Sequence, residues 1–509
     1  MAILRQKDDL CATVSGLLLG LSFPNPGMWF LAWFALVPWL LTMRRRPFRS
    51  GFITGVVFFA LVLYWLNIVM TRYGGLNLLL SLVAYLLLVA YLALYFGLVS
   101  WSATTIEQRL RVPILLTFPI LWVAAEYTRA HLLTGFPWAS LGYSQQACLP
   151  LIQTADLWGV AGVGLLVILV NLLLAESCRQ SGRSAGLLRI ALLLVAVAII
   201  LAGNGLYGRY RLQQFSATEP VNPLTVALAQ GNIEQGVKWS PAYRQQTLEQ
   251  YASLTAAASA QPVDLVVWPE SATPFFFQET SAQAEFVKAV AARADAALLF
   301  GSPAFKLSGK AIAYFNSAFL LSPQGVTLGR SDKVHLVPFG EYVPLKWLLP
   351  FVDKLVVGIG DFSPGNLQPI GFGSTRLGIL ICYEVIFPEL ARKYLNRGAN
   401  LLVNITNDAW FGSSSAPYQH LAMTSFRAVE NRVWIVRAAN TGISAFIDPL
   451  GRVHDQTELF TAASRVMQVD AHASPGFYTR HGDLLPMGCS GLSLLLLAMA
   501  LLRKKRSIS

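Results

Sequence analysis

Long apolar runs separated by short polar connections dominate the first two fifths of the chain and return near its end. A helix needs about 20 apolar residues to span the hydrocarbon core of a bilayer. The pattern predicts a membrane part of about eight helical spans, seven before residue 209 and one near the C-terminus. These runs cover roughly 9–24, 27–43, 51–71, 76–105, 112–131, 156–177, 187–207 and 488–502.

Between the seventh and eighth runs the pattern changes to short β-branched runs that alternate with helical periodicity. This alternation predicts an α/β domain with helices layered over sheet. The turn sequences SPQG (322–325) and DPLG (448–451) indicate hairpins, so we expect a mixed sheet. The predicted strands are 223–230, 264–271, 297–305, 314–325, 377–384, 399–408, 433–442 and 444–453, and the predicted helices are 245–260, 280–296 and 420–432.

The two patterns predict three segments. Residues 1–209 form a membrane domain with about seven transmembrane helices. Residues 210–487 form the α/β domain, which would carry the chemistry. Residues 488–509 form a C-terminal transmembrane helix and a basic tail.

Basic residues occupy alternate connections of the membrane part. By the positive-inside rule, the basic connections face the cytoplasm. Both termini are then cytoplasmic, as an even number of spans requires, and 210–487 lies outside the cytoplasm. The basic set comprises Arg5, Lys7, Arg44, Arg45, Arg46, Arg49, Arg109, Arg111, Arg179, Arg183, Arg189, Arg503, Lys504, Lys505 and Arg506.

Composition agrees with a membrane protein. The chain is 54% hydrophobic and 13% charged, whereas soluble chains carry about 25% charged residues. The net charge of +12 arises from the membrane connections, since 209–487 holds basic and acidic residues in almost equal numbers. A nucleic-acid partner is therefore not expected.

One cysteine stands apart from the other four. Cys11, Cys148, Cys178 and Cys489 lie in or beside apolar runs, whereas Cys382 lies within the α/β domain. No CxxC or metal-ligand spacing is present, so we expect neither a metal nor an organic cofactor. A lone thiol outside the cytoplasm is a candidate reactive group.

Three ionisable residues each follow a strand-like run. Glu270 stands in LVVWPES (265–271), Lys333 in SDKVHLVPFGEYVP (331–344) and Cys382 in RLGILICYEVIFPE (376–389). A carboxylate can take the proton of an attacking thiol, and an ammonium can stabilise the oxyanion that forms. The backbone N–H of Tyr383 could join that oxyanion site. The set indicates acyl transfer.

Each residue also has an ordinary interpretation. A single cysteine at a strand end is most often a small core residue. Glu270 after Trp-Pro could cap a helix, and Lys333 could pair with a neighbouring acid on a surface. Only the combination, in these local settings and this order, favours the catalytic interpretation.

The order Glu270, Lys333, Cys382 resembles the nitrilase superfamily, whose Glu–Lys–Cys triad lies on an α-β-β-α sandwich. The resemblance covers about 223–455 and continues through NITNDAWFG (404–412). Together with the membrane part, the FPNPG turn (23–27) and HLVPFGEYVPL (335–345), the whole chain resembles the apolipoprotein N-acyltransferase family.

That resemblance implies a multi-pass enzyme of the bacterial inner membrane with a periplasmic catalytic domain. Its acyl donor would be a phospholipid, and its acceptor the N-terminal amine of a diacylated apolipoprotein. Cys382 would form a thioester, Glu270 would be the general base and Lys333 the oxyanion stabiliser. Glu341 would be a second essential carboxylate, with supporting or substrate-binding positions at Trp239, Tyr383, Glu384 and Trp410.

Two apolar stretches of the α/β domain have two interpretations. PFFF (274–277) and KWLLPFVDKLVVGIG (346–360) either bury against the domain or form lids that dip into the bilayer and keep water from the thioester. The lid candidates are Phe275, Phe276, Phe277, Trp347 and Phe351.

Other interpretations stay open. A membrane-tethered amidase would use the same triad with water as the acceptor, and a transporter would explain the spans alone. Glu126 and Arg129, near the end of the fifth run, are functional candidates if they lie at membrane depth, or they simply reach the interface.

Overall fold

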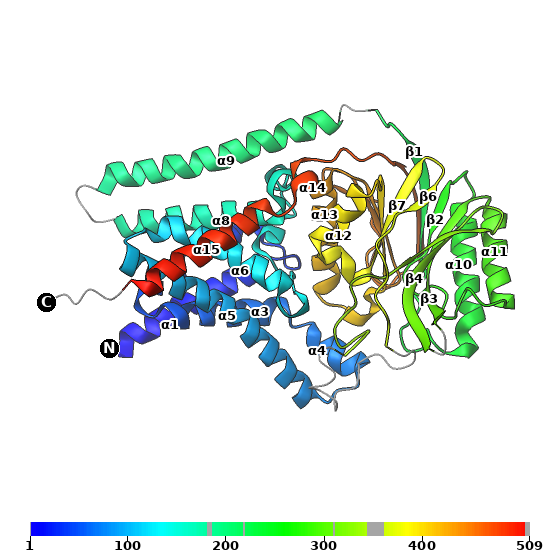
Figure 1. Ribbon diagram of the computed structural model, residues 1–509, viewed down its shortest axis with the longest axis horizontal. Coiled ribbons are helices and arrows are strands. Elements are labelled where there is room, and N and C mark those ends of the chain that lie inside the picture. Colours follow the sequence, from blue (N-terminus) through cyan, green and yellow to red (C-terminus); the bar gives the residue numbers. More distant parts are fainter. Residues whose placement is uncertain (1, 181–185, 217–218, 309–310, 344–360, 504–509) are drawn as a thin grey trace. The chain divides into compact units, whose positions relative to one another are not determined.

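The computed structural model describes all residues except 1, 181–185, 217–218, 309–310, 344–360 and 504–509. The chain divides into two compact units (Figure 1). The helical unit comprises Met1–Asn67, Asn77–Gln214 and His481–Ser509. The sandwich unit comprises Ile68–Leu76 and Phe215–Arg480, so the end of the third apolar run belongs with the α/β domain.

Helices cover most of the predicted apolar runs. By length and composition, four described helices could cross a membrane: α5, α8, α9 over Leu187–Phe215, and α15. A fifth span results if α3 and its continuation Leu66–Tyr73, bent by 57°, count together. The helices are α1 (Ala2–Leu21), α2 (Val37–Thr42), α3 (Pro47–Val62), α4 (Leu66–Ile68), α5 (Leu78–Leu110), α6 (Ile114–His131), α7 (Leu149–Ile152), α8 (Ala155–Gln180), α9 (Gly186–Ser216) and α15 (Leu484–Leu502).

The second predicted run, 27–43, is not one continuous helix. It divides into a 3-10 helix, Trp29–Trp33, then α2, then a second 3-10 helix, Met43–Arg45. Asn171 of α8 satisfies the backbone at the first break: its Oδ1 accepts from the Leu36 N–H at 2.9 Å, and its Nδ2 donates to the Ala32 carbonyl at 2.8 Å. Hydropathy cannot reveal this break, because the residues on both sides of it are apolar.

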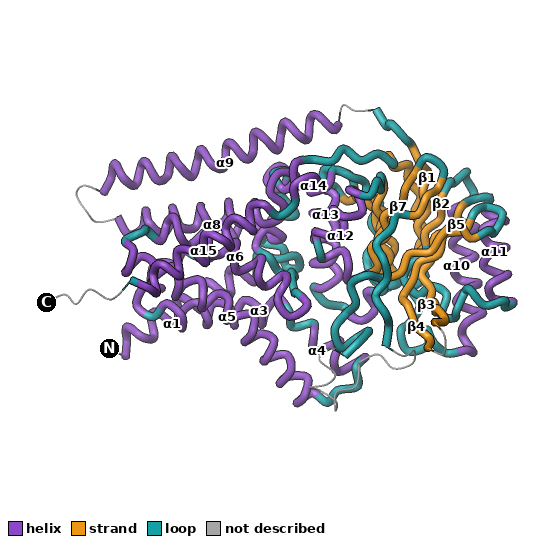
Figure 2. Tube along the Cα trace, viewed as in Figure 1, coloured by secondary structure: helices purple, strands orange, loops and turns teal. Residues whose placement is uncertain are grey.

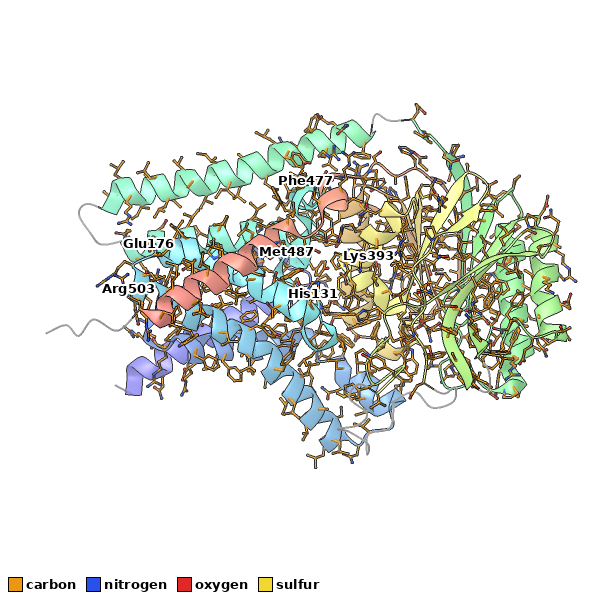
Figure 3. The ribbon with its side chains drawn as sticks, in the orientation of Figure 1. His131, Glu176, Lys393, Phe477, Met487 and Arg503 are labelled. Atoms are coloured by element: carbon orange, nitrogen blue, oxygen red, sulfur yellow. The ribbon has the colours of Figure 1, made fainter. Side chains whose placement is uncertain are left out.

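Several described basic residues lie at the end of the helical unit where α1 begins and α15 ends (Figure 1). Arg44 and Arg49 pair with Glu107 and Asp9, at 2.6 and 2.7 Å. Arg109 donates to the carbonyls of the last turn of α15. In Figure 3 Glu176 and Arg503 lie toward this end of the unit, and His131 and Met487 toward the other.

The sandwich unit contains two six-stranded sheets, shown in orange in Figure 2. The first has the order β12-β1-β2-β3-β4-β5 and the second β11-β10-β9-β8-β7-β6. Each has three central parallel strands, β1–β2–β3 and β7–β8–β9, with antiparallel neighbours, as the hairpin signals predict. The strands are β1 (Pro223–Gln230), β2 (Leu265–Val267), β3 (Ala297–Ser308), β4 (Ala311–Leu321), β5 (Thr327–Asp332), β6 (Ile370–Phe372), β7 (Thr375–Ile381), β8 (Leu401–Thr406), β9 (Ile435–Ala439), β10 (Ala445–Ile447), β11 (Val453–His454) and β12 (Ala463–Asp470).

Alternate residues of the strands supply two apolar layers. Val226 and Val267 of the first sheet join Ile379 and Val403 of the second in the core between the sheets. The opposite face of the first sheet packs against α10 and α11. The result is an α-β-β-α sandwich, as the strand–helix alternation predicts. Its helices are α10 (Arg244–Ala258), α11 (Ala282–Ala294), α12 (Pro388–Asn396), α13 (Ala416–Asn431) and the short α14 (Phe477–His481).

We predict that Asn171→Leu lowers the thermal stability of the detergent-solubilised protein. The change leaves the Leu36 N–H and the Ala32 carbonyl without this partner, at a cost of about 1–3 kcal/mol for each buried group. A lower Tm in thermal unfolding would support this role. Val195→Leu, on the exposed face of α9, is the control. Equal Tm values for the two variants would contradict it.

Candidate active site

The ends of three strands position the three residues singled out above. Glu270 follows β2, Lys333 directly follows β5, and Cys382 directly follows β7. The strands β2 and β5 run in the same direction in the first sheet, so their ends meet at one edge. The structure thus brings Glu270 and Lys333 together from positions 63 residues apart.

Glu270 is buried and held at both its main chain and its side chain. Its Oε1 accepts from the amide of Asn316 at 2.8 Å and its Oε2 from the Asn407 N–H at 2.9 Å. The following residue, Ser271, has a φ of +51°. A Cβ on Gly301 would lie 2.4 Å from the Ser271 nitrogen, so only glycine lets β3 approach this turn.

The Lys333 ammonium lies between two carboxylates. Its Nζ is 3.0 Å from Oε1 of Glu341 and 3.8 Å from Oε1 of Glu270. Burial alone would lower the pKa of Lys333, but these two carboxylates raise it above its usual value. The amide of Asn316 bridges both acids at 2.8 Å. Lys333 is therefore a permanent cation at neutral pH.

Cys382 occupies a strained turn between β7 and the following 3-10 helix, Cys382–Ile386. Its φ of +52° is rare for a residue with a side chain. The Glu384 carboxylate supports the turn, because it accepts from the N–H groups of Ile381 at 2.7 Å and of Val334 at 2.6 Å. It also accepts from His335 N–H at 3.0 Å. Glu384 thus ties the thiol turn to the segment that carries Lys333.

The surroundings of Cys382 favour the neutral thiol. Burial, with the Glu270 charge, raises the pKa of Cys382 to about 12, although Lys333 lowers it in part. Burial likewise raises the pKa of Glu384 to about 7. A thiol of this kind reacts only when a base takes its proton during attack. Glu270 is suitable, because its charge acts directly on the thiol.

A buried polar network lies behind the thiol. Asp408 accepts from Arg437 at 2.6 Å and from Thr406 at 2.8 Å, and its Oδ1 lies 3.1 Å from Nδ1 of His420. Burial alone would raise the pKa of Asp408, but Arg437 and His420 lower it to about 2. Asp408 is therefore a fixed anion, and it raises the pKa of Cys382 further.

The remaining implied positions lie in different settings. The exposed fraction of Trp239 is 36%, and it lies in the loop after β1. Tyr383 packs edge-on against Phe387 at 5.2 Å. Trp410 packs against Tyr73, with 5.4 Å between their ring centroids. Tyr73 lies in the segment Ile68–Leu76, which belongs to the same unit as Trp410.

The first aromatic stretch packs into the sandwich. Phe277 is 4% exposed and contacts Phe300 and Phe319. Phe275 packs against the same core cluster, and Phe276 contacts Phe305. For 274–277 the burial interpretation therefore fits this structure, and Phe277 is a core residue rather than a lid. Trp347 and Phe351 lie outside the described residues.

The sequence did not single out several side chains that the fold brings to the site. Asn316 lies on β4, Asn407 follows β8, and Lys238 lies in the loop after β1, where its Nζ donates to the Glu270 carbonyl at 3.0 Å. Asparagines and lysines are common in strands and loops alike, so the local sequence of these residues carries no signal. The one indication for the loop that carries Lys238 was the neighbouring Trp239, which the family resemblance implies as a supporting position.

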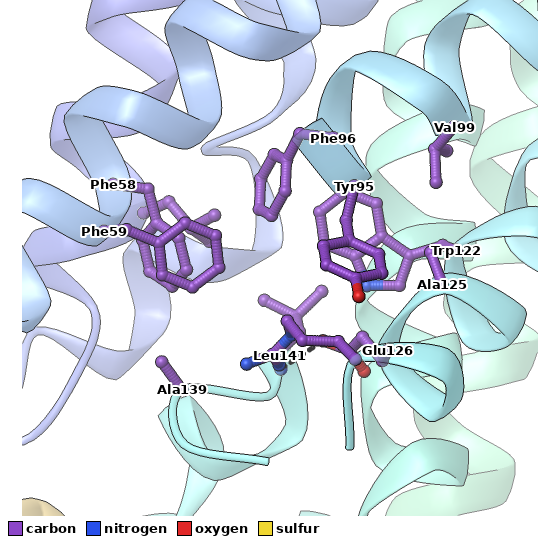
Figure 4. Close-up of a pocket in the computed structure, with 12 residues that line it drawn as sticks. Phe58, Phe59, Tyr95, Phe96, Val99, Trp122, Ala125, Glu126, Ala139 and Leu141 are labelled. Atoms are coloured by element: carbon purple, nitrogen blue, oxygen red, sulfur yellow. Dashed lines mark hydrogen bonds between the residues drawn. The ribbon is translucent and has the colours of Figure 1, made fainter. Parts of the chain in front are cut away.

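Glu126 and Arg129 lie within the helical unit and line an aromatic pocket (Figure 4). Arg129 donates to the carbonyls of Phe136 and Trp138, at 2.8 and 2.5 Å. Glu126 accepts from the Leu141 N–H at 2.8 Å. The two residues therefore hold the loop that follows α6, which is a structural role.

The sandwich, with a thiol, an ammonium and carboxylates at its strand ends, defines a protein of the carbon–nitrogen hydrolase class attached to a unit of apolar helices. The sequence model of that class, described as "Carbon-nitrogen hydrolase", matches residues 225–473. Residues 15–173 match the model "Apolipoprotein N-acyltransferase N-terminal domain".

The chain belongs to the apolipoprotein N-acyltransferase family. It is 48% identical to the apolipoprotein N-acyltransferase of Geobacter metallireducens, over 98% of this chain and 96% of the relative. It is 34% identical to that of Nitrosomonas europaea, over 97% and 96%. Among solved structures, Saccharomyces cerevisiae Nit3, a member of branch 10 of the nitrilase superfamily, is 21% identical over 50% of this chain and 93% of Nit3, with a TM-score of 0.39.

We predict opposite effects of two substitutions on Cys382 reactivity. Because Glu270 raises the pKa of this thiol and Lys333 lowers it, Glu270→Gln should move the pH profile of its alkylation to lower pH. Lys333→Met should move the profile to higher pH. The measurement is the rate of iodoacetamide addition to the Cys382 peptide by mass spectrometry. Lys288→Met, on the exposed face of α11, is the control. Shifts in the same direction would contradict the assignment.

Proposed function

We propose that this protein transfers an acyl chain from a phospholipid to the α-amino group of the N-terminal S-diacylglyceryl-cysteine of a bacterial lipoprotein. One observation carries the proposal: the 48% identity, over 98% of the chain, to a relative named apolipoprotein N-acyltransferase. The cluster of Glu270, Lys333 and Cys382 supports it, because acyl transfer needs a base, an oxyanion stabiliser and a nucleophile.

In the first half-reaction the Cys382 sulfur attacks the ester carbonyl of the phospholipid while Glu270 takes the thiol proton. Lys333 and the Tyr383 N–H stabilise the oxyanion. Collapse of the tetrahedral intermediate breaks the ester C–O bond, and Glu270 returns the proton to the departing lysophospholipid. A thioester on Cys382 remains.

In the second half-reaction the lipoprotein amine attacks the thioester. Glu270 takes a proton from the amine, the C–S bond breaks, and the thiolate regains that proton. The two half-reactions share one site, so the kinetics are ping-pong. The thioester intermediate thus replaces one direct acyl transfer, which has a high barrier, by two steps with lower barriers.

The neighbouring residues would support these steps. Glu341 is a second essential carboxylate, which holds the Lys333 ammonium at 3.0 Å. Glu384 keeps the thiol turn and the Lys333 segment in register. Trp239 and Trp410 would contact substrate, and the partial exposure of Trp239 supports this role.

The membrane arrangement we propose has about eight spans in the bacterial inner membrane. Residues 1–209 supply seven, residues 488–509 supply the eighth, and the catalytic domain is periplasmic. Both termini would be cytoplasmic. The described basic residues at one end of the helical unit support this orientation.

We predict that purified protein incubated with phospholipid carries an acyl group on Cys382. The adduct should be labile to hydroxylamine and absent from Cys382→Ala, with one lysophospholipid released for each thioester. Peptide mass spectrometry measures both. Glu270→Gln should form the adduct at least about 100-fold more slowly, as expected for loss of a general base.

The acceptor decides between transfer and the amidase alternative. If the thioester disappears only when a diacylated lipopeptide is added, the protein is a transferase. Equally rapid loss to water alone would favour the amidase. No adduct on wild-type Cys382 would refute the proposed mechanism.

We predict opposite labelling of the sandwich unit and of the residue that follows α15. Glu219→Cys, at an exposed position before β1, should react with a membrane-impermeant maleimide in spheroplasts. Arg503→Cys should react only after permeabilisation, because the positive-inside rule places it in the cytoplasm. The reverse pattern would refute the proposed orientation. A background with Cys178→Ser removes the exposed native thiol.

A further inference from the structure

Lys238 is a buried lysine at the candidate active site that takes no part in the two proposed half-reactions. Its exposed fraction is 0%, although lysine is almost never fully buried without a partner of opposite charge. Its Nζ donates to the main-chain carbonyl of Glu270 at 3.0 Å. Among the described residues, no carboxylate oxygen lies within the 4.0 Å that defines an ion pair with this nitrogen.

The loop that carries Lys238 is anchored to the rest of the site. Asn440 binds the beginning of the loop through the N–H and the carbonyl of Ile233, at 2.9 and 2.8 Å. The Asn407 side chain donates to Gln235 at 2.7 Å, while the Asn407 N–H donates to the Glu270 carboxylate at 2.9 Å. Asn407 therefore holds both the Glu270 carboxylate and the loop that carries Lys238.

The charge of Lys238 interacts with Glu270 and Cys382. Burial lowers the pKa of Lys238 to about 8, and the charges of Glu270 and Cys382 oppose that change. Lys333 acts on the same two groups, and Asp408 acts on Cys382. Two lysines therefore flank the base: Lys333 on the carboxylate side and Lys238 on the main-chain side.

A lysine that served only packing would not need its ammonium at a carbonyl next to the reacting groups, because removing an ion from water is costly. We propose that Lys238 is a positioning residue for the general base. Its ammonium holds the main chain of Glu270 in place for the proton transfer from Cys382, and its positive charge acts on Cys382 as well as on Glu270. This inference rests on the proposed function for its catalytic consequence, but not for its effect on the thiol.

The first test measures single-turnover formation of the Cys382 thioester from phosphatidylethanolamine in detergent micelles, with the full-length protein. Lys238→Met should lower the rate at saturating lipid by about 30-fold or more, with the half-saturating lipid concentration changed less than about threefold.

Lys238→Gln separates the hydrogen bond from the charge. Glutamine retains an N–H donor for the Glu270 carbonyl, so this variant should recover part of the rate. It lacks the charge, so the pH profile of Cys382 alkylation should still shift. It also supplies the test if Lys238→Met does not fold. Lys288→Met, whose lysine pairs with Glu285 on the exposed face of α11, should match wild type.

A second measurement needs no lipid substrate. Loss of a nearby positive charge should raise the pKa of Cys382, so the alkylation profile of this thiol should move to higher pH in both Lys238 variants. Wild-type rates with an unshifted alkylation profile in the folded variants would overturn the inference, as would a lower Tm with the alkylation profile unmoved. Absence of a thioester in wild type, with the alkylation shift present, would refute the proposed function and retain the placement of Lys238.

Discussion

The site depends on a buried ammonium held between carboxylates. Removing several charges from water is tolerated only where each has close partners of the right kind. Lys333 has Glu341 at 3.0 Å and Glu270 at 3.8 Å, and Asn316 donates to both acids. Such geometry requires the ends of separate strands to stay in register, and two apolar sheet faces packed against each other supply that rigidity. The charged groups can keep these distances only because the packed sheets hold the strand ends in place.

The same arrangement determines the protonation state of Cys382. Burial and the charges of Glu270 and Asp408 keep Cys382 as a thiol, and the opposing Lys333 does not reverse this. The left-handed turn at Cys382 persists because Glu384 fastens both the turn and the segment after Lys333. Glu384 therefore links the Cys382 turn to the segment after Lys333 through backbone hydrogen bonds. A neutral thiol of this kind needs a base to take its proton before it can react, as the proposed mechanism requires.

In the helical unit, polar side chains perform a related task for the backbone. Asn171 satisfies the break between Ala32 and Leu36, and Arg129 with Glu126 holds the loop after α6. Irregular backbone surrounded by apolar side chains needs such partners, since no water is available to replace them. Asn171, Glu126 and Arg129 therefore support the backbone of the helical unit, although an ionisable residue in an apolar run first indicates function.

The sequence by itself determined the division into apolar helices and an α/β domain, and the positions of most strands along the chain. It also determined the candidates Glu270, Lys333 and Cys382. These follow from periodicity and from residue types at strand ends, which are local properties. Only the tertiary structure decided that 27–43 is broken, that Phe277 is a core residue, and that Asn316, Asp408 and Lys238 join the site. Each of these outcomes depends on contacts between residues far apart in the chain. The local sequence around a lysine such as Lys238 does not differ between a lysine that faces water and one that bonds a buried carbonyl. Its burial depends on the elements that pack around it in the folded protein.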